Sequence, residues 1–187
     1  MIDLALVWVG IIGLGVLIYV VMDGFDLGIG ILFPFMNGTQ ERDVMMNTVA
    51  PVWDGNETWM VLGGAGLFAA FPLVYSTVLS ALYLPIIFMV VALIFRGVAF
   101  EFRFKATRTK YLWDLAFIWG SILSSFFQGV ILGAYIQGIQ TTNGIYSGGG
   151  WDWFTPFTCF TGLGVVVMYA TLGCGWLIWK TEKEIQQ

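Results

Sequence analysis

The sequence contains no histidine and few charged residues of either sign. Only 11% of its 187 residues are charged, whereas a soluble domain carries about 25%. Without histidine, this chain alone cannot build a His-ligated haem, copper or zinc site, so we expect it to bind no cofactor or metal by itself. The few bases form no clustered basic face of the kind that nucleic acids require, and we therefore expect no nucleic-acid partner.

Cysteine is also scarce. Cys159 and Cys174 lie in one apolar segment, and their separation along a single helix, about 22 Å, is too large for a disulfide. They are interpreted as packing residues rather than ligands. The eight methionines are scattered, which favours core filling over ligation of a haem held by a partner.

Hydrophobic residues dominate, at 58% of the chain, and 17% of the chain is aromatic. This composition predicts an all-α, polytopic membrane protein: one membrane domain over residues 1–187, built as a bundle of about five transmembrane helices. Each span needs roughly 20 apolar residues. The first is expected to be a retained span rather than a cleaved signal, because Met1-Ile2-Asp3 contains no base. The predicted spans cover approximately residues 4–35, 51–70, 75–100, 112–137 and 153–179.

Proline and glycine predict local features of these spans. Pro51 suits the first position of its helix, and Pro85 predicts a kink in the third span. Gly28 and Gly30 in the first span allow close backbone approach, and the small residues at 63–66 do the same in the second.

The distribution of bases predicts the orientation. With odd-numbered spans running inward, every base falls on the inner side, and the outer segments near 71–75 and 141–152 contain none. The positive-inside rule therefore predicts an external N-terminus. The bases are Arg42, Arg96, Arg103, Lys105, Arg108, Lys110, Lys180 and Lys183.

The segment Pro51 to Trp59, PVWDGNETW, is the strongest candidate for a functional site. Asp54 and Glu57 are three residues apart and share a helix face, at the start of an uncharged stretch where an ionisable group indicates function. The alternative for Asp54 is a helix N-terminal cap without a transport role. Trp53 and Trp59 are interpreted as interface anchors or packing residues, in preference to residues that stack on a bound ligand.

Two further sites carry ionisable groups within apolar sequence. Asp23 and Asp26 also share a face, and either handle protons or cap a broken helix. Arg96 is the deepest base, and we expect it to pair with Glu101 or with a carboxylate on another helix; the alternative is an arginine that snorkels to the headgroups.

Three segments together resemble subunit II of the cytochrome bd-type quinol oxidases, and the resemblance extends over the whole chain. They are Met22–Gly28 (MDGFDLG), Asn47–Trp59 (NTVAPVWDGNETW) and Phe95–Arg103 (FRGVAFEFR). The VWDGNE form, with FEFRFK, is most similar to the cyanide-insensitive branch, and the chain corresponds to about the first half of the family's subunit II.

The resemblance implies a non-haem subunit in the bacterial cytoplasmic membrane. It would form a heterodimer with subunit I, which carries haem b and haem d, and the complex would oxidise quinol and reduce dioxygen; small accessory subunits, lipid and quinone are further possible partners. In this family the Trp-Asp-Gly-Asn motif supplies an acid on the route of cytoplasmic protons to the oxygen-reducing haem. This acid corresponds to Asp54, with Asp26 as a weaker candidate.

We therefore expect Asp54 to relay protons, with Glu57, Asp26 and Asp23 extending the path and Trp53, Asn56, Trp59, Arg96 and Glu101 as structural or interface residues. The isolated chain is not expected to be catalytic. One alternative is a scaffold for assembly of subunit I, in which acid-to-amide changes alter assembly but not rate. A less favoured alternative is an independent proton-coupled transporter, which would transport without a partner.

Overall fold

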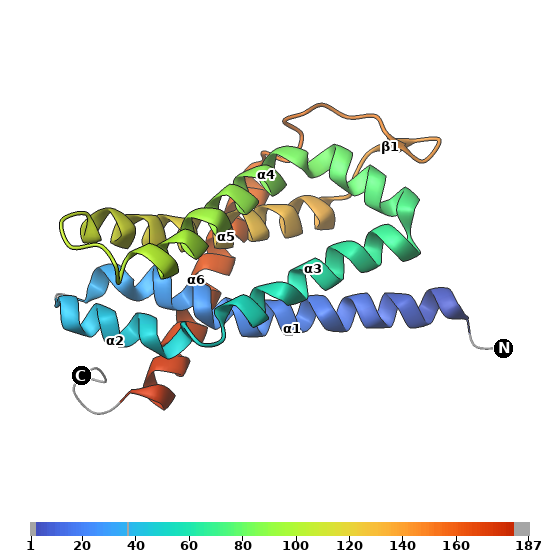
Figure 1. Ribbon diagram of the computed structural model, residues 1–187. Helices are drawn as coiled ribbons and strands as arrows, with labels where there is room; N and C mark the ends of the chain where they lie inside the picture. The colour runs from blue at the N-terminus through green and yellow to red at the C-terminus, as the bar shows by residue number, and fades with distance from the viewer. Residues whose placement is uncertain (1–2, 37, 182–187) are drawn as a thin grey trace.

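The computed structural model describes residues 3–36 and 38–181, and the predicted base Lys183 lies outside this part of the chain. The fold is all-α apart from one short hairpin (Figure 1). In chain order the elements are α1 (Leu4–Leu32), the 3-10 turn η1 (Phe33–Phe35), α2 (Thr39–Val49), α3 (Trp53–Ala70), α4 (Pro72–Phe102), α5 (Lys110–Gln137), β1 (Thr141–Thr142), β2 (Ile145–Tyr146) and α6 (Pro156–Lys180).

Within the described residues, four helical segments are long and apolar enough to cross a membrane: Leu4–Phe35, Pro72–Phe102, Lys110–Gln137 and Pro156–Lys180. These correspond to four of the five predicted spans, which confirms the polytopic membrane fold. The second predicted span, over 51–70, is not among them. Its helix α3 has 18 residues, and Asp54, Asn56 and Glu57 in its first turns leave an apolar stretch that is shorter than a bilayer core.

The helices form a bundle in which α3 lies beside α1, and α4 lies beside α5 (Figure 1). Helix α6 crosses the bundle and packs on both α1 and α5. The crossing of α1 and α6 leaves no room for side chains, because a Cβ on Gly28 would overlap the carbonyl oxygen of Tyr169 and one on Gly173 would lie 2.6 Å from the carbonyl carbon of Gly28. The predicted close backbone approach at Gly28 is therefore confirmed.

Proline has the predicted effect at one of two positions. Leu82, three residues before Pro85, has φ −117° and ψ 17°, which kinks α4, as predicted. Pro51, by contrast, lies in the turn before α3, and the helix begins at Trp53 with Val52 as its N-cap. The predicted first-turn position for Pro51 is wrong because residues 50–52 form the turn that joins α2 to α3.

Bases from distant parts of the sequence lie at one end of the bundle. The α1–α2 and α4–α5 connections lie at the same end, opposite the N-terminus (Figure 1). Lys180 at the end of α6 lies near α2, because Trp176 of α6 donates a hydrogen bond to Thr48. This arrangement agrees with the predicted external N-terminus, which remains a prediction.

The segment between α5 and α6, predicted as a loop, contains the short antiparallel pair of β1 and β2. Asn143 and Gly144 join the strands with φ values of 54° and 78°. Positive φ at both central residues is typical of a tight hairpin turn.

Candidate functional site

A cluster of ionisable side chains lies inside the bundle where α1, α3 and α4 meet. Nη1 of Arg96 lies 2.7 Å from Oδ1 of Asp23 and 3.9 Å from Oε2 of Glu57, and Nη2 lies 4.0 Å from Oδ2 of Asp26. Arg96, Asp23 and Asp26 are fully buried, whereas the Glu57 side chain is 25% exposed. We call these four residues the central ionic cluster.

The central ionic cluster corrects one prediction and confirms another. Arg96 does pair with carboxylates of other helices, as predicted, and complete burial excludes the snorkelling alternative. Glu101, the other proposed partner, instead pairs with Lys105 at the protein surface. Arg96 thus receives its counter-charges from α1 and α3 rather than from its own helix.

Asn56 of α3 binds the Asp26 carboxyl group of the central ionic cluster. Its Nδ2 donates a hydrogen bond to Oδ2 of Asp26 at 2.8 Å and lies 3.5 Å from the Met22 carbonyl oxygen. Because Asn56 is buried, this amide fixes the Asp26 carboxyl group against α3. These contacts of Asn56 agree with the structural role expected for it.

The central ionic cluster contains one base for three carboxyl groups. Several of its polar atoms are buried and have no hydrogen-bond partner within the described part of the chain: Asp23 Oδ2, Asp26 Oδ1, Glu57 Oε2, Arg96 Nε and Arg96 Nη2. Placing a second uncompensated negative charge in such a site is costly. The arrangement therefore favours a cluster that carries at least one proton and can exchange it.

The predicted lead residue, Asp54, lies outside this cluster. It is exposed, and together with Glu57 it lines a groove of about 410 Å³ between α3 and α4. Glu57 therefore belongs both to the groove and to the central ionic cluster. The groove is lined by Trp53, Asp54, Glu57, Thr58, Met60, Val61, Val90, Leu93, Ile94, Gly97 and Val98.

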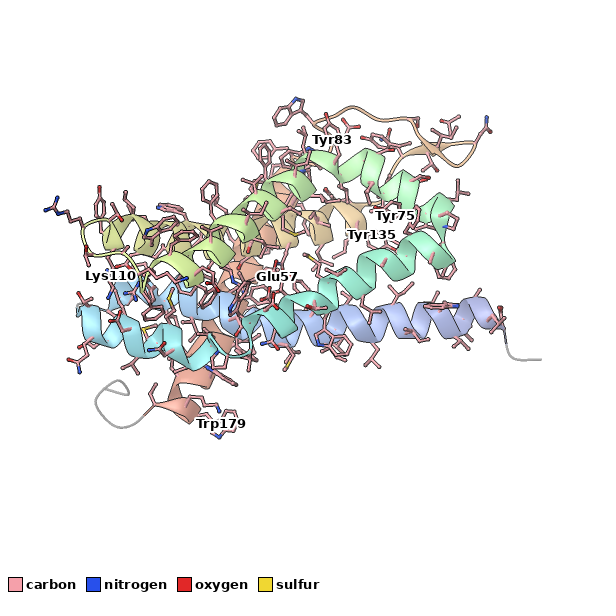
Figure 2. All side chains as sticks on the ribbon, in the orientation of Figure 1. Glu57, Tyr75, Tyr83, Lys110, Tyr135 and Trp179 are labelled. Carbon is pink, nitrogen blue, oxygen red and sulfur yellow. The ribbon has the colours of Figure 1, made fainter. Side chains whose placement is uncertain are left out.

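Glu57 lies away from both ends of the bundle (Figure 2). In Figure 2, Glu57 lies near the middle of the long axis, and the Lys110 label marks one end. Helix α2 and the α4–α5 connection extend past it (Figure 1).

The two tryptophans of the motif have different surroundings. Trp53 stacks on Phe100 with ring centroids 4.8 Å apart, and the Arg96 guanidinium lies 5.8 Å from its ring centroid. These contacts agree with the predicted packing role for Trp53. Trp59 is half-buried, and its role remains a prediction.

A second group of charges, which the sequence did not predict, lies at the basic end of the bundle. Arg103 is fully buried and pairs with Asp114 and, at 2.5 Å, with Asp43. Arg42 pairs with Asp114 at 3.1 Å and Lys110 with Asp43 at 2.9 Å. We call these five residues the terminal ionic cluster. The only sequence signal was the presence of Asp114 at the start of a predicted span.

The terminal ionic cluster affects the acidity of Asp43, which lies on α2 outside the spans. Partial burial acts to raise the pKa of Asp43. Hydrogen bonds and charges from Lys110 and Arg103 outweigh burial, so the pKa lies below its ordinary value. Asp43 is therefore ionised at neutral pH and holds α2 against α4 and α5.

A polar network also crosses the bundle beside Asp23. Nε2 of Gln128 donates to the Tyr19 hydroxyl at 2.8 Å, and the Tyr169 hydroxyl donates to Oε1 of Gln128 at 2.7 Å. Tyr19 lies one helical turn before Asp23, on the same face of α1. Single polar residues in apolar segments gave no reason to predict that these three would meet.

The residues present do not fit a His-ligated haem or metal. The chain has no histidine, and Cys159 and Cys174 are free thiols. Across residues 3–36 and 38–181, no three His, Cys, Asp or Glu side chains form a group that could hold a metal ion.

Comparison with known proteins gives consistent matches. The family model for cytochrome bd terminal oxidase subunit II matches residues 4–187. The chain is 34% identical over 190 residues to cytochrome bd-I ubiquinol oxidase subunit 2 of Escherichia coli K12, covering 97% of this chain and 50% of that protein. It is 40% identical over 121 residues to cytochrome bd ubiquinol oxidase subunit 2 of Bacillus subtilis, covering 63% of this chain and 36% of that protein.

A third relative is the probable cytochrome oxidase subunit 2 of Haemophilus influenzae, which is 33% identical over 174 residues and is covered over 46% of its length. The chain therefore spans about half the length of the curated relatives that it matches. The match to the family model extends over all four helices that could cross a membrane and over both ionic clusters. The chain belongs to the subunit II family of cytochrome bd terminal oxidases.

Proposed function

We propose that this chain acts as the non-haem subunit II of a bd-type quinol:oxygen oxidoreductase in the bacterial cytoplasmic membrane. It would dock to a subunit I that carries haem b and haem d, and the complex would oxidise quinol and reduce dioxygen. The names of the relatives as ubiquinol oxidase subunits support this assignment. The lack of histidine fits a division in which the partner subunit holds the haems.

Within the complex, we assign to this chain the uptake of protons from the cytoplasm toward the oxygen-reducing haem of the partner. The observation that carries this assignment is the central ionic cluster, in which Arg96 faces three carboxyl groups inside the bundle. One base cannot neutralise three carboxylates, so the cluster holds and releases protons at low energetic cost. An ionisable cluster inside a membrane protein is most often functional.

The path that we propose begins at Asp54 and continues through Glu57. Both residues line the groove between α3 and α4, and Oε2 of Glu57 lies 3.9 Å from Nη1 of Arg96. We propose that a proton that reaches Asp54 passes along this groove to Glu57, and from there to Asp26 or Asp23, which lie around the same guanidinium. In this proposal Asp54 receives protons at the exposed side of the groove, and Glu57 connects the groove to the central ionic cluster.

The test compares three single variants in the assembled complex: Asp54→Asn, Glu57→Gln and, as a control, Glu101→Gln. Glu101 is an exposed carboxylate outside the groove. We expect the first two to lower the quinol oxidase rate and proton uptake by at least about tenfold and the control to leave both unchanged. Normal turnover and uptake in Asp54→Asn would contradict the assigned role of Asp54.

The second candidate function is a scaffold for assembly of subunit I. It is favoured by the way in which Arg96 joins α1, α3 and α4 through ion pairs, since such a crosslink stabilises a fold whether or not protons move. A scaffold predicts that Asp23→Asn, Asp26→Asn and Glu57→Gln reduce the amount of assembled complex but not the rate per complex. Measuring haem content and turnover on the same purified samples separates the two functions.

A further inference from the structure

The two ionic clusters lie at successive levels of the same helix. Arg96 belongs to the central ionic cluster and Arg103 to the terminal ionic cluster. Arg96 lies on α4 and Arg103 is the C-cap of that helix, seven residues later and still with helical backbone angles, which places their Cα atoms about 10 Å apart on one face. Both arginines are fully buried. The space between them therefore decides whether protons can pass directly from the basic end of the bundle to the central carboxyl groups.

Three phenylalanines fill that space in a continuous row. Phe33 and Phe117 meet edge to face with centroids 5.0 Å apart, and Phe117 meets Phe100 in the same way at 5.1 Å. Phe33 and Phe117 are fully buried, and Phe100 is 7% exposed. We call these three residues the aromatic layer. Each comes from a different part of the chain: η1, α5 and α4.

Buried aliphatic side chains complete the packing around the aromatic layer. Met45, Met46 and Val49 of α2, together with Ala99 of α4, belong to the same cluster and are fully buried. Ala99 lies between the two arginines along α4, three residues after Arg96 and four before Arg103. Buried side chains of α2 and α4 thus pack around the aromatic layer.

An arginine caps the aromatic layer at each end. The Arg103 guanidinium lies 5.1 Å from the Phe33 ring centroid, and that of Arg96 lies 5.9 Å from the Phe100 centroid. Guanidinium groups bind the faces of aromatic rings, so the ends of the row are held in place. Phenylalanine has no exchangeable proton and no hydrogen-bonding atom, and water is costly to place between such rings.

We propose that the aromatic layer is a barrier to water and protons between the terminal and central ionic clusters, which leaves the groove at Asp54 and Glu57 as the route to the central carboxyl groups. Phe33, Phe100 and Phe117 are therefore positioning residues: they determine the side from which protons arrive. The direction of proton flow rests on the proposed function, whereas the barrier itself does not.

The barrier can be tested with a buried thiol. In the complete membrane-embedded protein with Cys159→Ser and Cys174→Ser, Ala99→Cys places a single thiol inside the layer, and Val49→Cys provides a second reporter. Silver ion is the probe, because it reacts with thiols but cannot cross dry apolar packing. With the layer intact, we expect both thiols to be protected from silver ion added on the side of Lys110. Rapid reaction of Ala99→Cys with the layer intact would overturn the proposal.

Opening the layer should remove the protection. Phe117→Ala, or Phe33→Ala if the first variant does not fold, is expected to speed the reaction of Ala99→Cys at least about tenfold. Phe117→Ile keeps the layer apolar and filled, and should retain protection. Phe127→Ala removes an aromatic ring from the same helix, α5, outside the layer and should also retain it. An unchanged reaction rate in folded Phe117→Ala would overturn the proposal.

A second measurement links the barrier to the proposed proton path. In the Asp54→Asn background, Phe117→Ala should restore part of the proton uptake of the complex, because it opens a direct path from the terminal ionic cluster. If proton uptake is not restored although the Ala99→Cys thiol reacts with silver ion, the aromatic layer does not determine the proton route. If Asp54→Asn alone leaves uptake normal, the proposed function fails, and the silver reaction still decides the barrier.

Discussion

Nη1 of Arg96 lies 2.7 Å from Oδ1 of Asp23, and both side chains are completely buried. This ion pair joins the C-terminal part of α4 to α1, two helices that are otherwise connected mainly through α3 and α5. Asp26 and Glu57 lie within 4.0 Å of the same guanidinium. The fold and the proposed proton path therefore depend on the same arginine.

Replacing Arg96 with methionine should strongly destabilise the protein. The change leaves three carboxyl groups without their base, and removing one partner of a buried ion pair costs about 3–5 kcal/mol. Unfolding of the purified protein in detergent, followed by loss of helical circular dichroism, measures this change. Lys105→Met is the matched control, because its pair with Glu101 is exposed and its loss should cost less than about 1 kcal/mol. Equal stability of the two variants would argue against a buried Arg96 pair.

Replacing Asn56 with leucine should destabilise the protein to a smaller extent. The Asp26 carboxyl group then loses the amide donor at 2.8 Å, and a buried acceptor left unpaired costs about 1–3 kcal/mol. Thr58→Val is the control on the same helix, because the Thr58 hydroxyl is exposed and donates only to the Asp54 carbonyl oxygen. The same unfolding measurement tests both variants, and an Asn56→Leu protein as stable as the control would refute the assigned role of Asn56.

Replacing Gly28 with alanine should separate α1 from α6. The added methyl group would overlap the carbonyl oxygen of Tyr169, and overpacking of a tight contact costs about 1–3 kcal/mol. Gly10→Ala on the same helix is the control, since a Cβ there would have no atom within 4 Å. We expect the control to keep or increase the stability of the protein in the unfolding measurement. If the two alanines behave alike, the close approach of α1 and α6 is not present in solution.

Acid should weaken the attachment of α2. The pKa of Asp43 lies below its ordinary value because Lys110 and Arg103 stabilise the carboxylate. The corresponding stabilisation is fully present above the unfolded-state pKa of about 3.9 and is lost as the pH falls through the lower pKa of the folded state. Between pH 6 and pH 3, unfolding temperatures should fall more steeply for the natural protein than for Asp43→Asn. Parallel pH profiles would contradict this assignment.

The sequence predicted the composition of the central ionic cluster better than its geometry. The spacing of Asp23 and Asp26 and the apolar surroundings of Arg96 indicated carboxylates on one face and an acidic partner for the base. Spacing alone could not show that Glu57 reaches Arg96 whereas Asp54 remains exposed. That difference depends on the rotation of α3, which is set by its start at Trp53 and by the packing of Gly63 and Gly66 on α1.

The terminal ionic cluster could not be predicted, because it joins two segments, residues 42–43 and 103–114, that are far apart in the sequence. Arg42 and Asp114 are separated by 72 positions, and Arg103 and Asp43 by 60. Local periodicity assigns each of them to a helix end, where exposed charges are common. Only the tertiary structure, in which Asp43 of α2 and Asp114 of α5 both reach Arg103, shows that this arginine is buried and paired with two aspartates.

The seven-residue separation of Arg96 and Arg103 has a mechanical consequence. Arg96 binds the carboxylates of α1, and Arg103 binds the ring of Phe33 directly after α1. Sliding α4 along α1 by one helical turn would break both attachments simultaneously, and a rotation that spared one would break the other. The register of the two helices is thus specified twice, so any relative shift of α1 and α4 requires both attachments to break.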